Sequence, residues 1–278
     1  MTNVVRLIDR EVIKHSAAIQ VQGSVGILSR RIWNVMLAHA YDHLPTQDEH
    51  TIKIKELADA LEFDSNDHDV LRESMRELVS ATVEWNTLGK DKESAWGLAS
   101  LLAHIEFERG IAKYSYSPFL RRMLHNPRMY AKIKLSLQNA FRSKYSLILF
   151  ELMHDYFDGS RQEGETPWIS VERFRKLMGV DESQYPAFKA LNQWVIRIAV
   201  DEVSTKTDIE VKAHFQRNGR QIAALKFTSV PRNGKKVKTK KPAPPDFKKL
   251  QADPKARKLD PRSGEYRGPV DHGIGIGW

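Results

Sequence analysis

The stretch "YPAFKALNQWVIRIAVDEV", residues 185–203, decides the fold that the sequence predicts. Apolar residues recur in it every three or four positions, which is typical of one face of an α-helix. Pro186 suits the first turn of such a helix, where its missing N–H costs little. The opposite face is polar, so its role depends on the segments around it. The predicted apolar stripe consists of Phe188, Leu191, Val195, Ile198, Ala199 and Val203.

The segments around this helix have the order of a winged helix, which is helix, short strand, short helix, turn, helix and β-hairpin. Ser143 is a candidate cap for the opening helix, and Asn218-Gly219 is the expected hairpin turn. A loop is expected between the opening helix and the short strand. The segments are "SKYSLILFELMHDYF" (143–157), the loop "DGSRQEGET" (158–166), "PWIS" (167–170), "SVERFRKLMGV" (170–180), "DESQ" (181–184) and "TDIEVKAHFQRNGRQIAALKFTSV" (207–230).

The first half of the chain repeats this order. We expect a helix over 28–44 capped by Ser29, a strand over 51–54, a helix over 55–62, and a helix starting near 69 and capped by Asn66 or Asp67. Its predicted stripe is Val70, Leu71, Met75, Leu78 and Val79. A β-ribbon with a turn at 108–110 follows. The predicted fold class is α+β, with winged-helix domains over 1–137 and 138–231 and a disordered basic tail over 232–278.

Composition limits the function classes. The chain has no cysteine, which excludes disulfides, thiolate metal sites and a cysteine nucleophile. No apolar run approaches the roughly 20 residues that span a bilayer, and the start is too charged for a signal peptide, so we expect a cytoplasmic protein. The net charge is +9, but residues 232–278 hold 13 basic and 5 acidic residues, which leaves 31 and 30 in residues 1–231. The basicity therefore belongs mostly to the tail, which would attract nucleic acid regardless of sequence.

Signatures of catalysis are missing. The sequence lacks a P-loop, H-E-x-x-H and G-x-S-x-G. No His-hydrophobe-His motif accompanies Tyr114 or Tyr116, which argues against a metal-dependent nicking enzyme. Residues 67–69 (Asp, His, Asp) would point about 100° apart on a helix and converge poorly on one ion. We interpret them, like His154 and Asp155, as structural, and predict no enzyme activity, metal or cofactor.

The polar face of the helix over 185–203 has the residue types that read bases in the major groove. Lysine binds guanine O6 and N7, and asparagine or glutamine binds adenine N6 and N7. The preceding helix would hold phosphates, and the hairpin would reach an adjacent backbone or minor groove. The alternative is an ordinary amphipathic helix with a hydrated face. The predicted DNA contacts are Ser183, Gln184, Tyr185, Lys189, Asn192, Gln193 and Arg197, with Arg173 and Lys176 before them and Lys212, His214, Arg217 and Arg220 on the hairpin.

Two other features carry predictions. Trp194 either packs at the edge of the core or anchors a partner, and the core edge is favoured. The third helix of the first half begins with "DSNDHD" (64–69), which would repel phosphate, and only Arg72 and Arg76 are basic there. The ribbon of that half is apolar enough for a subunit interface, and we expect that half to dimerise or to make secondary DNA contacts. The ribbon residues are Leu98, Leu101, Leu102, Ile105 and Phe107.

Over about residues 1–230 the chain resembles plasmid replication initiators of the iteron-binding, two-winged-helix (Rep_3-like) family. The resemblance is most specific in "KYSLILFELMHDYF", "ISVERFRKLMGV", the stretch over 185–203 and "TDIEVKAHFQRNGRQIAALKFT". The chain departs from the family pattern at Gln193 and Trp194, where basic residues are common. The matching run includes Tyr185, Phe188, Lys189, Val195, Ala199, Glu202, Val203, Thr207, Asp208 and Ile209.

This resemblance implies a plasmid-encoded protein of the bacterial cytoplasm. A monomer would bind repeated sites in double-stranded origin DNA, help to melt adjacent AT-rich DNA, and recruit the host initiator and replicative helicase. A homodimer in equilibrium with it would repress its own gene. The open alternatives are a transcriptional regulator without a replication role, a tyrosine-dependent nickase, and a protein-interaction scaffold.

Overall fold

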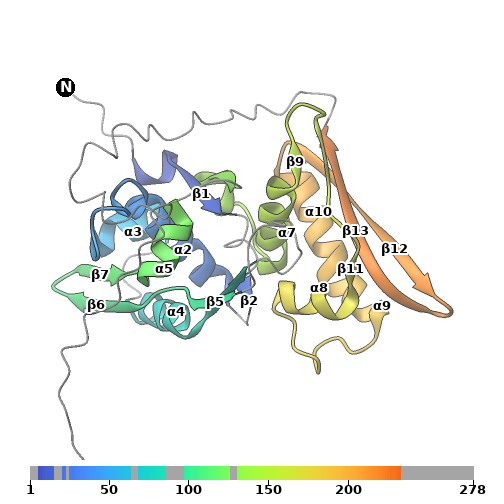
Figure 1. Ribbon diagram of the computed structural model, residues 1–278, viewed down its shortest axis with the longest axis horizontal. Coiled ribbons are helices and arrows are strands. Elements are labelled where there is room, and N and C mark those ends of the chain that lie inside the picture. Colours follow the sequence, from blue (N-terminus) through green and yellow to red (C-terminus); the bar gives the residue numbers. More distant parts are fainter. Residues whose placement is uncertain are drawn as a thin grey trace, which may run out of the picture. The chain divides into compact units, whose positions relative to one another are not determined.

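The computed structural model describes residues 6–15, 21–22, 25–63, 68–85, 97–125 and 130–232 (Figure 1). The tail predicted from Arg232 onward lies outside this range apart from Arg232 itself, and so do the candidate caps Asn66 and Asp67. Among the described helices, none combines the length and the apolar character needed to cross a membrane. The predicted α+β class is confirmed, because both halves mix helices with antiparallel strands.

The first winged helix has the predicted element order, with a different start to its first helix. That helix, α2, is capped by Gly26, and Ser29 lies buried inside it rather than at its end. Glu77, on the third helix, accepts hydrogen bonds from the Gly26 N–H (2.9 Å) and from the Ser29 hydroxyl. The carboxylate thus satisfies donors at the helix start that a serine cap would otherwise satisfy. The helices are α2 (Ile27–Ala40), α3 (Ile54–Leu61) and α4 (His68–Ser80), with the 3-10 turns Leu7–Asp9 and Tyr41–His43.

Strand β7 organises the sheet of the first domain. It pairs antiparallel with β3, the short strand before α3, and with β6. The predicted turn between β6 and β7 is confirmed, with positive φ at Arg109 (49°) and Gly110 (77°). Two smaller groups join β2 to β4 and β5, and β1 to β8. The bounds are β1 (Glu11–His15), β2 (Val21–Gln22), β3 (His50–Lys53), β4 (Thr82–Trp85), β5 (Gly97–Ser100), β6 (His104–Glu108), β7 (Ile111–Ser115), α5 (Pro118–His125), β8 (Tyr130–Lys134) and α6 (Leu135–Gln138).

The apolar ribbon of the first domain is not the continuous exposed surface that the sequence suggested. Leu101 and Leu102 are buried in the core, at 1% and 0% exposure, and the Leu101 carbonyl accepts a hydrogen bond from the Trp33 indole (3.3 Å). Leu98 is 52% exposed. The two leucines follow β5 at a bend toward the core, so period-two alternation fails there. Val70, predicted in the core stripe of α4, is also exposed.

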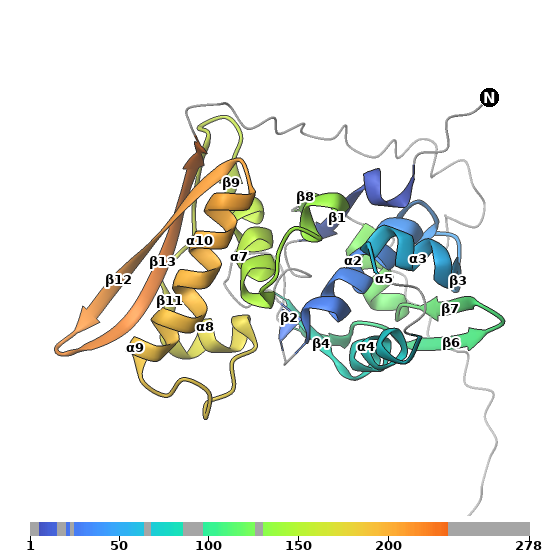
Figure 2. The same cartoon turned by 180° about the vertical axis from the view of Figure 1, so that it is seen from behind.

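The second winged helix is built around β13, which pairs with β10, β11 and β12 (Figure 2). Ser143 caps α7 as predicted and accepts from the Tyr145 N–H (3.2 Å). The segment predicted as a loop over 158–166 instead contains the second half of the β9–β10 hairpin. These strands are too short for a periodic signal. The bounds are α7 (Lys144–Asp155), β9 (Phe157–Asp158), β10 (Glu163–Glu165), β11 (Ile169–Ser170), α8 (Val171–Met178), α9 (Phe188–Leu191), the π-helical turn η3 (Asn192–Ile196), α10 (Arg197–Lys206), β12 (Ile209–Asn218) and β13 (Gln221–Pro231).

A buried ion pair joins β1 to α7. Lys14 Nζ lies 2.8 Å from Glu151 Oε2, and both side chains are almost fully excluded from solvent. The second oxygen of Glu151 accepts from the Asn34 amide on α2 (2.8 Å), which also donates to Gln138 (2.9 Å). Lys14 Nζ lies 5.0 Å from the ring centroid of Trp33. Burial lowers the pKa of Lys14, and the Glu151 carboxylate opposes that shift.

We expect Lys14→Met to destabilise the protein by about 3–5 kcal/mol, because it leaves a buried carboxylate unpaired. Adding Glu151→Gln should recover part of this loss, because the amide carries no charge and still accepts from Asn34. Urea unfolding measures both changes, and Lys55→Met is the control, because the exposed Lys55–Asp59 pair should contribute less than about 1 kcal/mol. Equal effects of Lys14→Met and Lys55→Met would contradict the assignment.

A buried histidine makes the first domain sensitive to acid. His50 is 3% exposed and packs against the rings of Tyr114 (5.5 Å) and Tyr116 (6.2 Å). Burial, with smaller contributions from the positive charges of His39, Arg121 and His43, lowers its pKa to about 4. The unfolded chain, with a pKa of about 6.5, therefore binds the proton more readily than the folded chain does.

The contribution of His50 to the free energy of unfolding should be fully present above about pH 6.5. It should be lost as the pH falls toward 4. Between pH 7 and pH 5 the loss should be about 2 kcal/mol, from the difference between the two pKa values. Urea titrations at the two pH values should show a smaller pH dependence in His50→Gln than in the parent. His104→Gln, at an exposed position of β6, is the control, and an unchanged pH dependence in His50→Gln would refute the assignment.

Candidate nucleic-acid interface

The helix predicted from residues 185–203 is continuous from Phe188 to Lys206 but contains a π-helical turn. In that turn the Arg197 N–H donates to the carbonyl of Asn192, five residues back. Apolar residues at 191, 195, 199 and 203 would drift by about 40° per step around a regular helix of 3.6 residues per turn. The wider turn holds more residues and reduces that drift. The helix thereby buries Leu191, Val195, Ile196, Ala199 and Val203.

Two expectations for this helix are wrong. Ile198 is 37% exposed, and Ile196 takes its place in the core at 1% exposure. The predicted apolar stripe assumes a regular α-helix, and the π turn interrupts that regularity. Pro186 precedes the helix rather than standing in its first turn, because the cap is Ala187. Before it, Tyr185 has a left-handed backbone (φ 53°) that redirects the chain into the helix.

Arg175 fixes the turn between α8 and the helix over 188–206, which takes the place of the recognition helix of a winged helix and is called so below. Arg175 was not among the predicted site residues. Its guanidinium donates to the carbonyls of Asp181 (3.3 Å), Gln184 (2.8 Å) and Tyr185. The only sequence signal is its place in the last turn of α8, after which Gly179 ends the helix (φ 58°). Its donors are directed to the protein backbone, so we assign it a positioning role.

Two of the predicted contact residues also hold the turn together. Asp181 accepts from the backbone N–H (2.9 Å) and the hydroxyl (2.6 Å) of Ser183, and these bonds lower the pKa of Asp181. The Gln184 side chain accepts from the Asp181 N–H (3.4 Å). Ser183 and Gln184 are exposed, so the turn presents them at the surface in a fixed shape.

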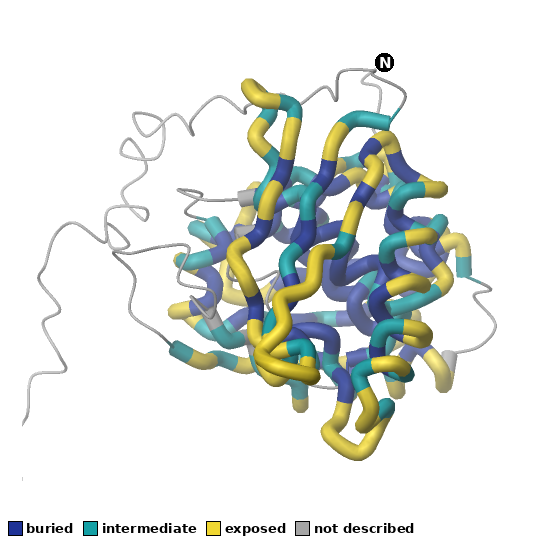
Figure 3. Tube along the Cα trace, turned by 90° about the vertical axis from the view of Figure 1, so that its right-hand side faces the viewer, coloured by how far each residue is buried: buried dark blue, intermediate teal, exposed yellow. Residues whose placement is uncertain are grey.

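The exposed face of the recognition helix carries a row of polar side chains at four-residue spacing. Lys189, Gln193 and Arg197 are all exposed, and Asn192 is half-buried at the edge of the row. Figure 3 shows how exposed and buried stretches alternate along the described chain. Within the described part of the chain, Lys189 and Arg197 make no ion pair. Glu202, farther along the helix, accepts from the backbone N–H groups of Arg142 (2.7 Å) and Ser143 (3.2 Å). That carboxylate is therefore occupied at the start of α7.

The two basic residues predicted on α8 differ. Arg173 is exposed and makes no ion pair among the described residues, while its backbone N–H donates to the cap Ser170 (3.2 Å). Lys176 is paired with Glu172 at 2.9 Å, which raises the pKa of Lys176. A phosphate would have to compete with Glu172 for Lys176, so Arg173 is the better placed cation.

The hairpin of β12 and β13 forms the wing, and its tip projects past the helices on the side of α9 (Figures 1 and 2). Arg217 and Arg220 are exposed near its tip, where Gly219 has a φ of 58°. Asn218 pairs with Gln221, so the turn is one residue later than predicted. Lys212 is partnered by Glu210 (3.4 Å), and His214 by the Thr228 hydroxyl (2.8 Å). The unpaired charge of the wing therefore concentrates at its tip.

The corresponding helix of the first domain has its arginines neutralised by its own acids. Arg72 lies 3.4 Å from Asp69, and Arg76 is paired with Glu73. These cations are already paired, whereas Arg173, Lys189 and Arg197 make no ion pair among the described residues. The phosphate repulsion predicted from "DSNDHD" stays a prediction, because Asp64, Ser65, Asn66 and Asp67 lie outside them.

The tyrosines considered for strand cleavage are inaccessible. Tyr114 is fully buried and its hydroxyl donates to the Met36 carbonyl (2.8 Å), while Tyr116 is 3% exposed. Burial raises the pKa of both hydroxyls, so forming a phenolate nucleophile is costly. Among the described residues, no cluster of three or more His, Asp or Glu side chains could hold a metal ion.

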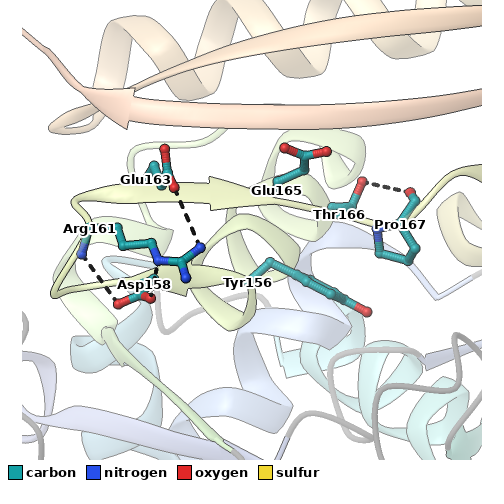
Figure 4. A pocket seen from close by; sticks show the side chains of 7 residues that line it. All are labelled: Tyr156, Asp158, Arg161, Glu163, Glu165, Thr166 and Pro167. Carbon is teal, nitrogen blue, oxygen red and sulfur yellow. Dashed lines mark hydrogen bonds and ion pairs between the residues drawn. The ribbon is translucent and has the colours of Figure 1, made fainter.

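A hollow of about 510 Å³ lies beside the β9–β10 hairpin, and three of the seven residues that line it are acidic (Figure 4). Arg161 lies between Asp158 (3.7 Å) and Glu163 (4.0 Å), and Glu165 is paired with Lys226 (2.6 Å). The carboxylates and their internal ion pairs make this hollow unsuited to a phosphate backbone. Tyr156, Thr166 and Pro167 complete the lining.

Comparisons with known proteins agree with the two-domain architecture. Residues 11–154 match the first winged-helix domain of initiator replication proteins, and residues 170–229 match the second. A replication initiation protein from Escherichia coli is 26% identical over 187 residues, which is 66% of this chain and 57% of that protein. The chain thus spans little more than half of that relative.

A solved structure, that of the Pi initiator protein in complex with iteron DNA, has the same fold. Its TM-score to this chain is 0.63 at 17% identity, and the match covers 83% of this chain and all of the other. The domain order, the winged-helix geometry and the family match all agree with the resemblance seen in the sequence. The chain therefore belongs to the family of initiator replication proteins built from two winged-helix domains.

Proposed function

We propose that this chain is a sequence-specific DNA-binding replication initiator whose second winged helix reads the major groove. One observation carries the proposal. Lys189, Gln193 and Arg197 form an exposed row on the recognition helix, and neither cation of the row has an ion pair among the described residues. Lysine and arginine recognise guanine, and glutamine recognises adenine, through the major-groove edges of the bases.

Residues around this row would position the duplex. Arg173 on α8 and Arg217 and Arg220 at the wing tip are exposed and suit phosphates on either side of the groove. Lys176, Lys212 and His214 are less available to phosphates, because each already has a partner in the protein. Ser183, Gln184 and Tyr185 would approach DNA on the turn that Arg175 holds. The basic tail would add sequence-independent attraction.

Family membership supports the steps that follow binding. We propose that the protein binds repeated sites in a plasmid origin, opens adjacent AT-rich DNA, recruits the host initiator and replicative helicase in the bacterial cytoplasm, and represses its own gene as a dimer. The similar structure was solved with iteron DNA. Opening would come from binding energy that favours deformed DNA rather than from catalysis, because Tyr114 and Tyr116 are buried.

The proposed dimer contact in the first domain involves fewer residues than the sequence suggested. Leu101 and Leu102 belong to the core, so a partner could reach Leu98 and the half-exposed Ile105 and Phe107. A charge at Leu101 would unfold the domain and report nothing about assembly. Leu98 is the position at which a substitution tests dimerisation.

DNase footprinting on the DNA that flanks the gene for this protein tests the proposed function. Several protected sites with the same sequence, in direct repeat beside an AT-rich segment, are expected. A single protected palindrome would instead indicate a transcriptional regulator, and no protection would indicate a protein-interaction scaffold. Supercoiled plasmid incubated with the protein and Mg²⁺ or Mn²⁺ should remain uncut.

Replacing Lys189 and Gln193 by alanine should strongly reduce sequence preference, because each lost base contact costs about 1–3 kcal/mol. Equilibrium binding to a protected repeat and to a scrambled duplex, at one salt concentration, measures the preference. Lys206→Ala is the control, because Lys206 is an exposed lysine at the far end of the same helix. Undiminished preference in the double variant would refute the assignment of the recognition helix.

A further inference from the structure

Trp194 is an exposed aromatic residue in the middle of the recognition helix. Its side chain is 50% exposed, whereas Trp33 in the first domain is 2% exposed. The prediction that Trp194 packs at the edge of the core therefore does not hold for the whole ring, because half of the side chain is exposed. Within the described residues, no aromatic ring or cation stacks on the Trp194 indole. The ring is thus presented to solvent without a stacking partner in the described part of the chain.

The helix holds this ring outward by its own geometry. Val195 and Ile196, the next two residues, are buried at 0% and 1% exposure, and Leu191 is buried on the preceding turn. The π turn places Trp194 between these core contacts and is closed by the hydrogen bond from Arg197 to Asn192. An indole has few rotatable bonds, so a contact with it costs little side-chain entropy.

A second exposed apolar residue lies next to Trp194. Ile198, at 37% exposure, stands four residues farther along the helix, so the two side chains are neighbours on its surface. This apolar row runs beside the polar row of Lys189, Gln193 and Arg197. The recognition face therefore offers hydrogen-bonding groups and apolar contact area side by side.

An A·T pair presents the matching pattern in the major groove. Adenine shows N7 and N6, which glutamine can bind, and thymine shows its 5-methyl group, the only apolar group on any major-groove edge. We propose that Trp194, with Ile198 beside it, is a specificity-determining residue that contacts thymine 5-methyl groups in the target duplex. This inference rests on the proposed function of the same helix.

The charges around the ring favour DNA over protein as the partner. Lys189 and Arg197 flank the apolar row and are exposed, so this face suits a polyanion. A second copy of the chain would bring the same cations against them, and like charges at an interface disfavour association. Contact between two copies through Trp194 is therefore an outcome that the experiment must detect.

The test replaces thymine by uracil, which removes only the methyl group. The repeat protected in footprinting is synthesised with dT, with dU at every thymine, and with dU at single positions. The parent protein should bind the dT duplex about four-fold more tightly for each methyl group contacted. Trp194→Ala should bind the dT and dU duplexes equally and still prefer both over a scrambled duplex through Lys189, Gln193 and Arg197.

Trp168→Ala is the matched control, because Trp168 is 45% exposed in the same domain but lies off the recognition helix, over Lys226. It should keep the parent's dT-to-dU ratio. Circular dichroism checks that each variant is folded, and the single-position dU duplexes test the parent without any substitution.

Three results would overturn the inference. One is a parent that binds dT and dU duplexes equally, and another is a Trp194→Ala variant that retains the parent's ratio. The third is a Trp194→Ala variant that keeps the parent's dT-to-dU binding ratio but changes its oligomeric state in sedimentation. That result would make Trp194 a contact between two copies of the protein. A parent that fails to prefer the repeat over the scrambled duplex would instead refute the proposed function itself.

Discussion

The hydrogen bonds to Glu151 are the constraint that fixes α7 against the strand and the helix near the start of the chain. This carboxylate is on α7, and its partners are Lys14 on β1 and Asn34 on α2. A buried carboxylate is tolerated only when its charge and both its oxygens are satisfied. Because the partners come from distant parts of the sequence, α7 has to meet β1 and α2 in one register. An apolar contact would not impose such a restriction.

The two domains share an architecture but use their charges differently. In the first, the arginines of α4 are paired with acids one turn away on the same helix. In the second, Glu202 caps the start of α7 instead, which leaves the cations of the recognition face without ion pairs among the described residues. Similar folds thus present different surfaces because their acidic residues are engaged in different places. Element order alone therefore could not have said which of these helices carries cations without ion pairs.

The order of helices and strands could be predicted because it depends on local apolar periodicity, and both winged helices follow it. Features that depend on contacts distant in sequence could not. Ser29 is a good cap by residue type, but Glu77 from α4 made that cap unnecessary. Ile198 fits a regular helix, yet the π turn brings Ile196 to the core. Leu101 and Leu102 turn into the core where a bend interrupts the ribbon.

The candidate site could also be predicted only in part, because some of its contacts leave no pattern in the sequence. The residue types on the recognition helix indicated a base-reading face, and Lys189, Gln193 and Arg197 are exposed there. Their DNA contacts and the domain boundaries remain predictions. The ion-pair partners of Lys176 and Lys212 are four and two residues away in the sequence, so both pairs could have been anticipated from spacing. The role of Arg175 could not, because its acceptors are backbone carbonyls and leave no pattern of side chains.

The way Arg175 holds its turn also bears on how this protein could evolve. Its three acceptors are main-chain carbonyls, which every amino acid possesses. The path of the chain into the recognition helix is therefore specified without regard to the side chain at 182, whereas the Ser183 hydroxyl also bonds to Asp181 within the turn. Descendants of this chain could exchange the side chain at 182 while the loop keeps its course. The left-handed backbone at Tyr185 is the exception, and that position should vary least.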